Sequence, residues 1–215
     1  MRLPAEFASV ERMPVKGRQG WKIVERVQFG DCDVYEVRRS FTKGSDLRVG
    51  RVLFYEGSKR RQTFGFTLAG PDGAVWHGGA ATNVRRHALE RDGFEIAMRD
   101  KSGFAAHLEP DTSPGDGWTL ELTETFDRPL KGTLSRGSRT LLVTGTNKLA
   151  GTPFPLDETT GYVFESDGKP VAAVEVINNG AVWIPPAIDA ADRAPVTVAI
   201  AALLLFEELR KTLPE

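Results

Sequence analysis

The stretch that decides the fold lies near the end of the chain: Val196-Thr197-Val198-Ala199-Ile200-Ala201-Ala202-Leu203-Leu204-Leu205-Phe206. Wound as a helix, it is apolar on every side, whereas an amphipathic surface helix has one apolar stripe and one polar face. Asp192 is placed to cap its start, and Arg210 and Lys211 suit the negative end of the helix dipole. The pattern predicts a helix over about residues 192–209 that protein surrounds on every side.

The residues ahead of this helix alternate between apolar and polar side chains as β-strands do. Phe64, Phe66 and Leu68 alternate with small or polar residues, and such alternation gives a strand one inner and one outer face. Pairs of Asp or Asn with Gly separate many of these segments and tolerate the positive φ of tight hairpin turns. The last strands before the helix are predicted over Tyr162–Glu165, Val171–Ile177 and Ala181–Ile184, with turns at Asp167-Gly168 and Asn179-Gly180.

The predicted fold class is therefore all-β dominated: a closed antiparallel β-barrel that encloses the hydrophobic C-terminal helix. A barrel that closes around the helix keeps water from every face of it. Two alternatives stay open, a terminal helix in an oligomer interface and a helix that plugs the open end of a sandwich. Residues 1–20 are interpreted as an irregular lead-in, and residues 21–213 as a single barrel domain.

The composition is that of a folded, soluble protein. The chain has 215 residues, 27% of them charged, and a formal net charge of −1, which provides no general field for binding nucleic acid. Its single cysteine, Cys32, excludes an intrachain disulfide and a multi-cysteine metal site. The apolar run is far shorter than the roughly 20 residues of a bilayer-spanning helix, and the first residues lack the apolar part of a secretory signal. We therefore expect a cytoplasmic protein.

The end of the chain resembles the tubby-like barrel superfamily, which includes the tubby C-terminal domain, the phospholipid scramblases and the plant LURP-one-related proteins. The resemblance rests on the strand Val171–Val176, the short aromatic strand Val182–Ile184, Asp189 and the hydrophobic helix Val196–Phe206, in that order. Members usually carry a longer basic segment between the last strands, where this chain has the tight turn Asn178-Asn179-Gly180. The resemblance implies a barrel around a central helix, and a non-enzymatic module that binds an anionic ligand such as a phospholipid head group.

Basic residues gather in the first half of the chain. Between Tyr35 and Arg61 there are eight basic residues and three acidic ones. Arginine forks bind phosphate oxygens in pairs, so neighbouring strands with these residues would form a site for a phosphorylated small molecule or an anionic lipid. The alternative is a solvated surface whose charge is balanced by acids elsewhere. The candidate ligand-binding residues are Arg38, Arg39, Lys59, Arg60, Arg61, Arg85 and Arg86.

The histidines form no local motif for catalysis or metal binding. His77, His87 and His107 share no metal-ligand spacing, so we expect no metal site and no cofactor. The run His77-Gly78-Gly79-Ala80 is interpreted as a bulged strand end, because no nucleophile elbow accompanies it.

The cysteine and the carboxylates form no local catalytic motif, although the two carboxylates of a glycosidase need not be close in the chain. Cys32 lies between Asp31 and Asp33, whose charges raise a thiol pKa and oppose nucleophilic chemistry. A group of carboxylates in and after a Pro/Gly-rich loop is predicted to face solvent. These are Asp111, Asp116, Glu121 and Glu124.

Two further hypotheses for function stand beside the binding module. The first is a small-molecule hydrolase or isomerase whose site combines a histidine with a carboxylate at strand ends. The second is an interaction protein that forms dimers through its C-terminal helix. The aromatic residues near the basic clusters fit the inner-face alternation, so nucleic acid is not expected as a partner.

Overall fold

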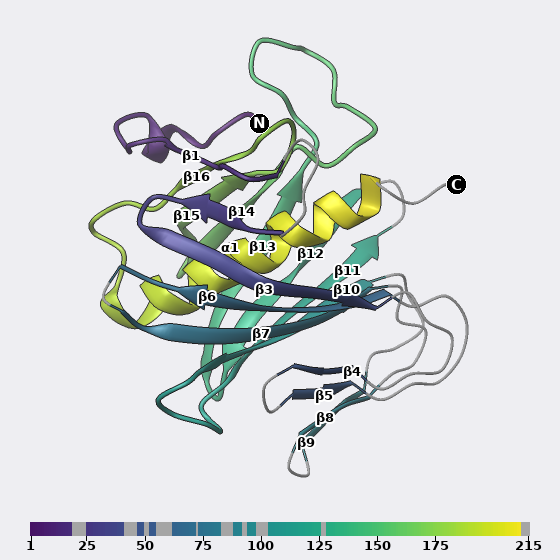
Figure 1. Cartoon of the computed structure of the whole chain (residues 1–215). Coiled ribbons are helices and arrows are strands. Elements are labelled where there is room, and N and C mark those ends of the chain that lie inside the picture. Colours follow the sequence, from purple (N-terminus) through teal and green to yellow (C-terminus); the bar gives the residue numbers. More distant parts are fainter. Residues whose placement is uncertain are drawn as a thin grey trace.

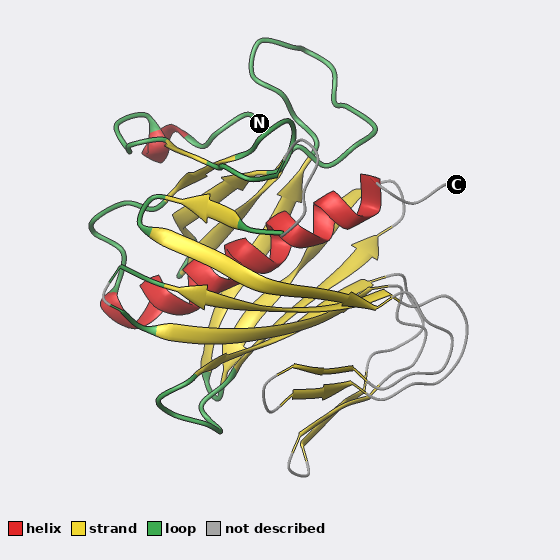
Figure 2. Ribbon diagram, viewed as in Figure 1, coloured by secondary structure: helices red, strands yellow, loops and turns green. Residues whose placement is uncertain are grey.

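The computed structural model describes residues 1–18, 25–40, 47–49, 52–54, 62–71, 73–82, 88–91, 94–97, 103–125 and 128–211. This part of the chain forms a large antiparallel sheet, a small antiparallel sheet and one long helix (Figures 1 and 2). A short 3-10 helix, η1 (Ala5–Phe7), lies near the N-terminus.

The large sheet has 12 strands. Most neighbouring strands follow one another in the sequence, and in two cases a hairpin of the second sheet is inserted between them. Such a sheet is a meander, which twists and curls as strands are added. In spatial order its strands are β1 (Met13–Pro14), β16 (Ala181–Trp183), β15 (Lys169–Glu175), β14 (Gly161–Ser166), β13 (Arg139–Thr146), β12 (Arg128–Arg136), β11 (Trp118–Thr125), β10 (Gly103–Pro110), β7 (Val75–Thr82), β6 (Gln62–Ala69), β3 (Cys32–Ser40) and β2 (Val27–Phe29).

The two ends of this sheet meet at a single bridge. Directly after β1, the N–H of Lys16 donates to the carbonyl of Gln28 in β2 at 2.8 Å, and the N–H of Gln28 donates back at 3.0 Å. This exchange joins the first and last strands in space. The sheet is therefore a nearly closed antiparallel barrel, as the sequence predicts.

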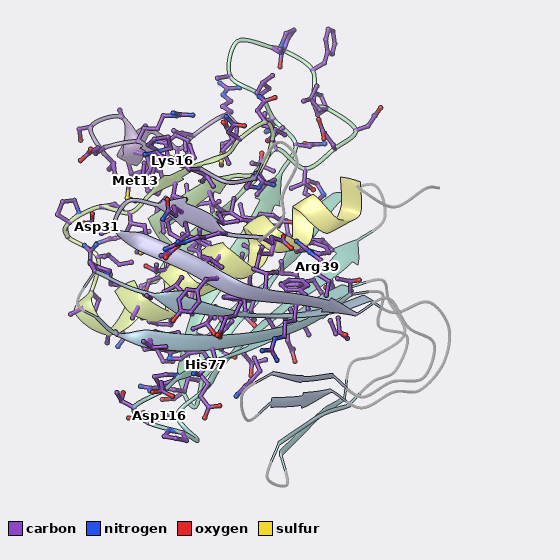
Figure 3. The ribbon with its side chains drawn as sticks, viewed as in Figure 1. Met13, Lys16, Asp31, Arg39, His77 and Asp116 are labelled. Carbon is purple, nitrogen blue, oxygen red and sulfur yellow. The ribbon has the colours of Figure 1, made fainter. Side chains whose placement is uncertain are left out.

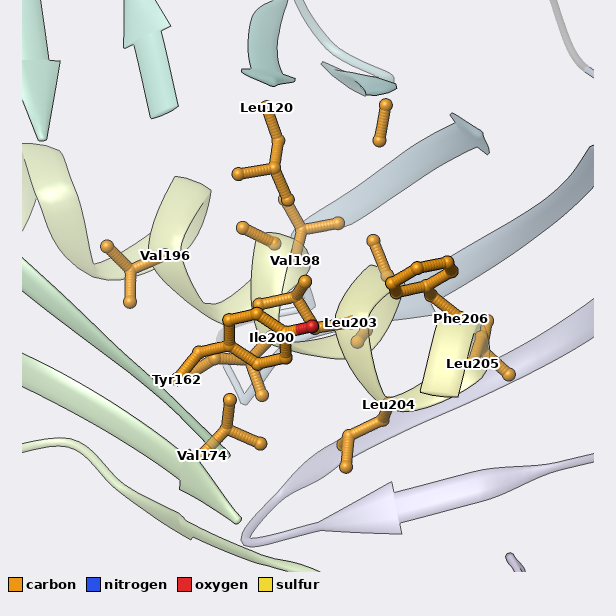
Figure 4. Close-up of a cluster of buried hydrophobic side chains, with 14 of the residues drawn as sticks. Leu120, Tyr162, Val174, Val196, Val198, Ile200, Leu203, Leu204, Leu205 and Phe206 are labelled. Carbon is orange, nitrogen blue, oxygen red and sulfur yellow. The ribbon is translucent and has the colours of Figure 1, made fainter. Parts of the chain in front are cut away.

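The helix α1 (Ala190–Lys211) runs through the barrel, with strands on both sides of it (Figure 1). Every residue from 195 to 206 is buried, which covers all faces of more than three helical turns. Phe206 lies near the C-terminal end of the helix (Figure 4), and its ring stacks on Phe104 of β10 with centroids 4.5 Å apart. The predicted enclosure of an all-apolar helix is confirmed.

The helix begins slightly earlier than its predicted start. The carboxylate Oδ1 of Asp189 accepts a hydrogen bond from the N–H of Ala191 at 2.8 Å, so Asp189 caps the first turn. Asp192 was the predicted cap, but it lies inside the helix and is buried. Asp189 and Asp192 both precede the apolar run. Which of them caps the helix depends on where the backbone becomes helical, and the sequence does not show that position.

The strands next to the helix follow the predicted alternation. Phe64, Phe66 and Leu68 of β6 are all buried and face the helix side of the sheet. The hairpin between β14 and β15 turns at Asp167 and Gly168, whose φ angles of 51° and 74° are the positive values that such a tight turn requires. The three last predicted strands correspond to β14, β15 and β16.

Four strands form a second sheet in the order β4 (Leu47–Val49), β5 (Val52–Phe54), β8 (Ala88–Arg91) and β9 (Phe94–Ala97). Their two hairpins interrupt the connections from β3 to β6 and from β7 to β10. Strand β4 lies beside β6 and β7 (Figure 1). Ala81 and Ala105, cross-strand neighbours on the outer face of the barrel, are fully buried there. The sequence interpretation had assigned all strands to one barrel.

The N-terminal segment packs on the outside of the barrel at β14, β15 and β16. Phe7 of η1 lies in a small apolar cluster with Met1 and with outward-facing residues of these strands. Those residues are Val163, Ala173, Ala181 and Trp183. The lead-in interpreted as irregular therefore contains η1 and β1, and it covers one wall of the barrel.

Candidate functional site

The basic clusters stand in the sequence next to strand ends that are neighbours in the barrel. Ser40, at the end of β3, pairs with Thr63, and Gln62, at the start of β6, pairs with Thr82 at the end of β7. In the sequence, the three clusters lie just before Ser40, just before Gln62 and just after Thr82. The same barrel end receives the C-terminal half of α1, because Phe206 stacks on Phe104 of the neighbouring strand β10. Five of the candidate residues lie outside the described part: Lys59, Arg60, Arg61, Arg85 and Arg86.

The two candidate arginines that the structure describes have different surroundings. Arg38 is exposed on the outer face of β3, opposite Gly65. Arg39 is directed to the interior, where its guanidinium lies over the ring of Phe64 at 5.5 Å from the centroid. Strand alternation is the signal in the sequence that separates these adjacent residues, because successive side chains point to opposite faces.

Arg39 fastens the end of the helix to the barrel (Figure 3). Its Nη1 donates to the carbonyl of Leu205 at 3.3 Å, and its other nitrogens bind the carboxylate of Glu25, with an Nε to Oε2 distance of 2.9 Å. A carbonyl oxygen has two lone pairs, so that of Leu205 can accept from Arg39 in addition to a helical N–H. Arg39 therefore has a role within the fold, and Arg38 is the one of these two candidate arginines that faces solvent.

A second polar group crosses the outer wall of the barrel on four strands. The hydroxyl of Thr67 on β6 donates to Oε2 of Glu36 on β3 at 3.0 Å and lies 3.3 Å from Nδ1 of His77 on β7. The other ring nitrogen, Nε2, lies 3.3 Å from Oδ1 of Asp111, which follows β10. Glu36 lies in a β-bulge with φ of 53°, a backbone conformation that side chains other than glycine rarely adopt. The bulge turns its carboxylate toward Thr67.

The chemistry open to this group is limited by burial. Thr67 is buried and its hydroxyl is already bonded, so it is not placed to attack a substrate. The imidazole of His77 is 28% exposed and is the group that a solvent molecule or ligand could reach. Among the described residues no cluster of three or more His, Cys, Asp or Glu side chains could hold a metal ion. The arrangement is a histidine held between a hydroxyl and a carboxylate.

The other histidines and carboxylates are dispersed. The ring of His107 packs directly over Gly117, where any side chain would overlap it, and His87 lies outside the described residues. Asp116 is exposed and pairs with Arg136 at 2.9 Å, as expected for a solvated face. Glu121 is half-buried, and this burial raises the pKa of its carboxyl. The side chain of Glu124 is not among those described.

The glycines after His77 serve packing rather than a bulge. Strand β7 pairs with β6 in unbroken register from Val75 to Thr82, so the predicted bulged strand end is wrong. A Cβ on Gly78 would overlap the ring of Phe66 on the neighbouring strand. Gly78 thus leaves room for an aromatic side chain of the core.

Cys32 is held in its neutral form, as predicted, but for a different main reason. Burial is the larger cause that raises the pKa of the thiol, to about 11, and the charge of Asp31 adds to it. The second flanking acid, Asp33, is instead bound by the guanidinium of Arg26, with an Nε to Oδ1 distance of 2.7 Å. A thiol in this state is a weak nucleophile at neutral pH.

Comparison with known protein families, curated proteins and solved structures found no match to this chain. In the part of the chain that the structure describes, no helix combines the length and hydropathy needed to cross a bilayer.

Proposed function

We propose that this protein is a non-enzymatic binding module of the tubby-like barrel superfamily that acts in the cytoplasm. It recognises an anionic ligand, a phosphorylated small molecule or a phospholipid head group, on its outer surface. The basic clusters of the sequence, with Arg38 as the described member that faces solvent, supply the cations for this ligand.

The observation that carries this proposal is the cross-strand pairing of Ser40 with Thr63 and of Gln62 with Thr82. Three basic clusters that are far apart in the sequence stand next to strand ends that lie side by side. From this adjacency in the sequence we infer that the three clusters act on one ligand, and phosphate is the group that several arginine forks bind best.

The occupied barrel interior also supports a ligand site on the outside. In barrels that hold a small molecule, the ligand takes the place that α1 fills here. The apolar run of α1 is buried within its own barrel, so it offers no apolar face to a second copy of the chain.

Liposome co-sedimentation tests the proposal. Phosphatidylcholine vesicles with and without phosphatidylinositol bisphosphate, each at low and physiological salt, distinguish lipid-selective binding from general adsorption. Soluble inositol trisphosphate as competitor tells whether the head group alone is recognised. The expected result is selective, salt-sensitive binding, and the absence of binding at low salt would remove the proposal.

Charge reversals at the proposed site, with one matched reversal elsewhere, make the test specific. Arg38→Glu is expected to weaken binding, and the double variant Arg60→Glu with Arg61→Glu is expected to abolish it. Lys169→Glu is the matched control, because Lys169 is exposed at the start of β15, at the opposite end of the barrel. Equal losses in the control and in Arg38→Glu would show a non-specific charge effect and contradict the proposed site.

A second candidate function rests on the contact between His77 and Asp111. A histidine next to a carboxylate is the arrangement of a general base, so a small-molecule hydrolase or isomerase site is the alternative. Hydrolysis of an activated ester such as p-nitrophenyl acetate, measured for the native protein and for His77→Ala, tests it. A rate above background that His77→Ala removes would favour the enzyme, and identical rates in the two proteins would exclude this use of His77.

A further inference from the structure

The seam where the barrel closes opens into a cavity beside Pro14. Lys16 and Gln28 exchange both backbone hydrogen bonds, so the next such pair toward the N-terminus would join Pro14 to Gly30. Proline has no N–H and cannot complete that pair. Strands β1 and β2 therefore separate at Pro14, although β1 stays paired with β16 on its other side.

The opening is a cavity of about 350 Å³, lined by residues 11–14 and 16 on one side and residues 28–33 on the other. We refer to it as the seam cavity. Its size falls in the range of sites for small molecules. Met13 is partly buried and provides apolar surface, and its sulfur lies over Gly30, whose φ of 52° lets the hairpin turn there.

The charged side chains of the seam cavity are of both signs. Arg12 and Lys16 are exposed cations, and within the described part of the chain neither forms an ion pair. Glu11 is an exposed acid that likewise has no ion-pair partner among described residues, and Asp31 is exposed at the turn. The remaining acid, Asp33, is neutralised by Arg26. Two cations and two acids thus remain for a ligand, and Figure 3 labels one of each, Lys16 and Asp31.

We propose that the seam cavity binds a small zwitterion, a free amino acid or a dipeptide. Its carboxylate binds Arg12 and Lys16, its ammonium group binds Glu11 and Asp31, and its apolar part contacts Met13. Charge complementarity selects this class, because the two acids repel a polyanion such as a phosphorylated ligand. The seam cavity lies at the start of β3, whereas Arg38 lies near its end, so the proposal does not depend on the proposed function.

The chain carries its own reporter for this site. Cys32 is the single cysteine of the sequence and lines the seam cavity, so a bound ligand shields its thiol. The experiment measures the rate at which iodoacetamide labels Cys32 in the full chain, with increasing glycyl-leucine. We expect saturable protection. When the glycyl-leucine concentration is ten times its dissociation constant, about a tenth of the sites stay free, so labelling should be roughly tenfold slower.

Control ligands and a matched pair of variants distinguish binding in the seam cavity from non-specific slowing of the labelling reaction. N-acetyl-glycyl-leucine amide, which lacks both charges, and inorganic phosphate are expected to give no protection. Arg12→Ala is expected to lose the protection by glycyl-leucine, and Arg2→Ala, at another exposed arginine outside the cavity, to keep it. Calorimetric titration of the unlabelled protein with glycyl-leucine gives a second readout. Absence of saturable protection, equal protection by the blocked dipeptide, or protection by phosphate alone would overturn the proposal.

Discussion

Arg139, at the start of β13, holds Asp192 in the first turns of the buried helix, with its Nε 2.6 Å from Oδ1. Its Nη2 also binds Oδ2 of the capping residue Asp189 at 2.8 Å. The carboxylate of Asp192 is buried, whereas Arg139 is partly exposed at the rim. One guanidinium thus fixes the N-terminal end of α1 to the barrel, while Arg39 fixes the C-terminal end at Leu205.

Loss of this rim contact is expected to destabilise the fold. Arg139→Ala leaves a buried carboxylate without its cation, which costs far more than loss of a solvated ion pair. The melting temperature measured by circular dichroism should fall, and adding Asp192→Asn should recover part of the loss because no charge is then buried. Lys169→Ala, at an exposed position, is the control and should leave it unchanged. A fall that Asp192→Asn deepens would contradict this account.

The helix is expected to be the main source of core stability. Leu203 is fully buried, so Leu203→Ala should lower the free energy of unfolding by about 3 kcal/mol through lost contacts and a cavity. That corresponds to roughly 6–12 °C in melting temperature for a chain of this size. Leu142→Ala removes the same atoms at a position that is 46% exposed, and should change the free energy by no more than about 0.5 kcal/mol. Similar losses in both variants would argue against burial of the helix.

The sequence contains the pattern of this core, and its all-apolar helix implies a closed barrel, but the sequence does not reveal the pairing that closes it. The helix that is apolar on all faces and the alternating strands β6 and β14 to β16 could be predicted. Both patterns follow from the repeat of side-chain directions along a helix or a strand. Closure depends on the bridge from Lys16 to Gln28, a pairing in a segment without alternation. The second sheet was missed because its strands alternate like those of the barrel. The polar group of Glu36, Thr67, His77 and Asp111 depends on strand register, which no spacing in the sequence reveals.

A side chain at position 78 is expected to destabilise the fold because it would overlap the ring of Phe66. Gly78→Ala places a methyl group where the ring of Phe66 lies, and such overpacking costs about 1–3 kcal/mol. Phe66→Leu should be less harmful in the Gly78→Ala background than alone, because the smaller side chain relieves the overlap. Chemical denaturation of the four proteins gives this coupling energy. Gly70→Ala is the control, since its Cβ would meet only the carbonyl of Ala74 at 3.6 Å. Additive effects of the two changes would contradict the packing role of Gly78.

The reactivity of Cys32 is expected to rise at unusually high pH. Burial raises the pKa of this thiol from 9.0 to about 11, so the rate of alkylation by iodoacetamide should still climb above pH 9 in the folded protein. The same shift has a consequence for stability. The unfolded thiol ionises at lower pH than the folded one, so this contribution to stability is complete below pH 9 and is lost as the pH rises toward 11.

Asp31→Asn separates the two causes of this shift. Because the charge of Asp31 is the smaller cause, the variant should move the midpoint of the alkylation profile down only slightly, and burial should keep it well above the value of a free thiol. Asp116→Asn, at a distant exposed acid, should leave the midpoint in place. A midpoint near 9 in the native protein would show that the thiol is solvated at the seam, and a large drop in Asp31→Asn would make the carboxylate, not burial, the main cause.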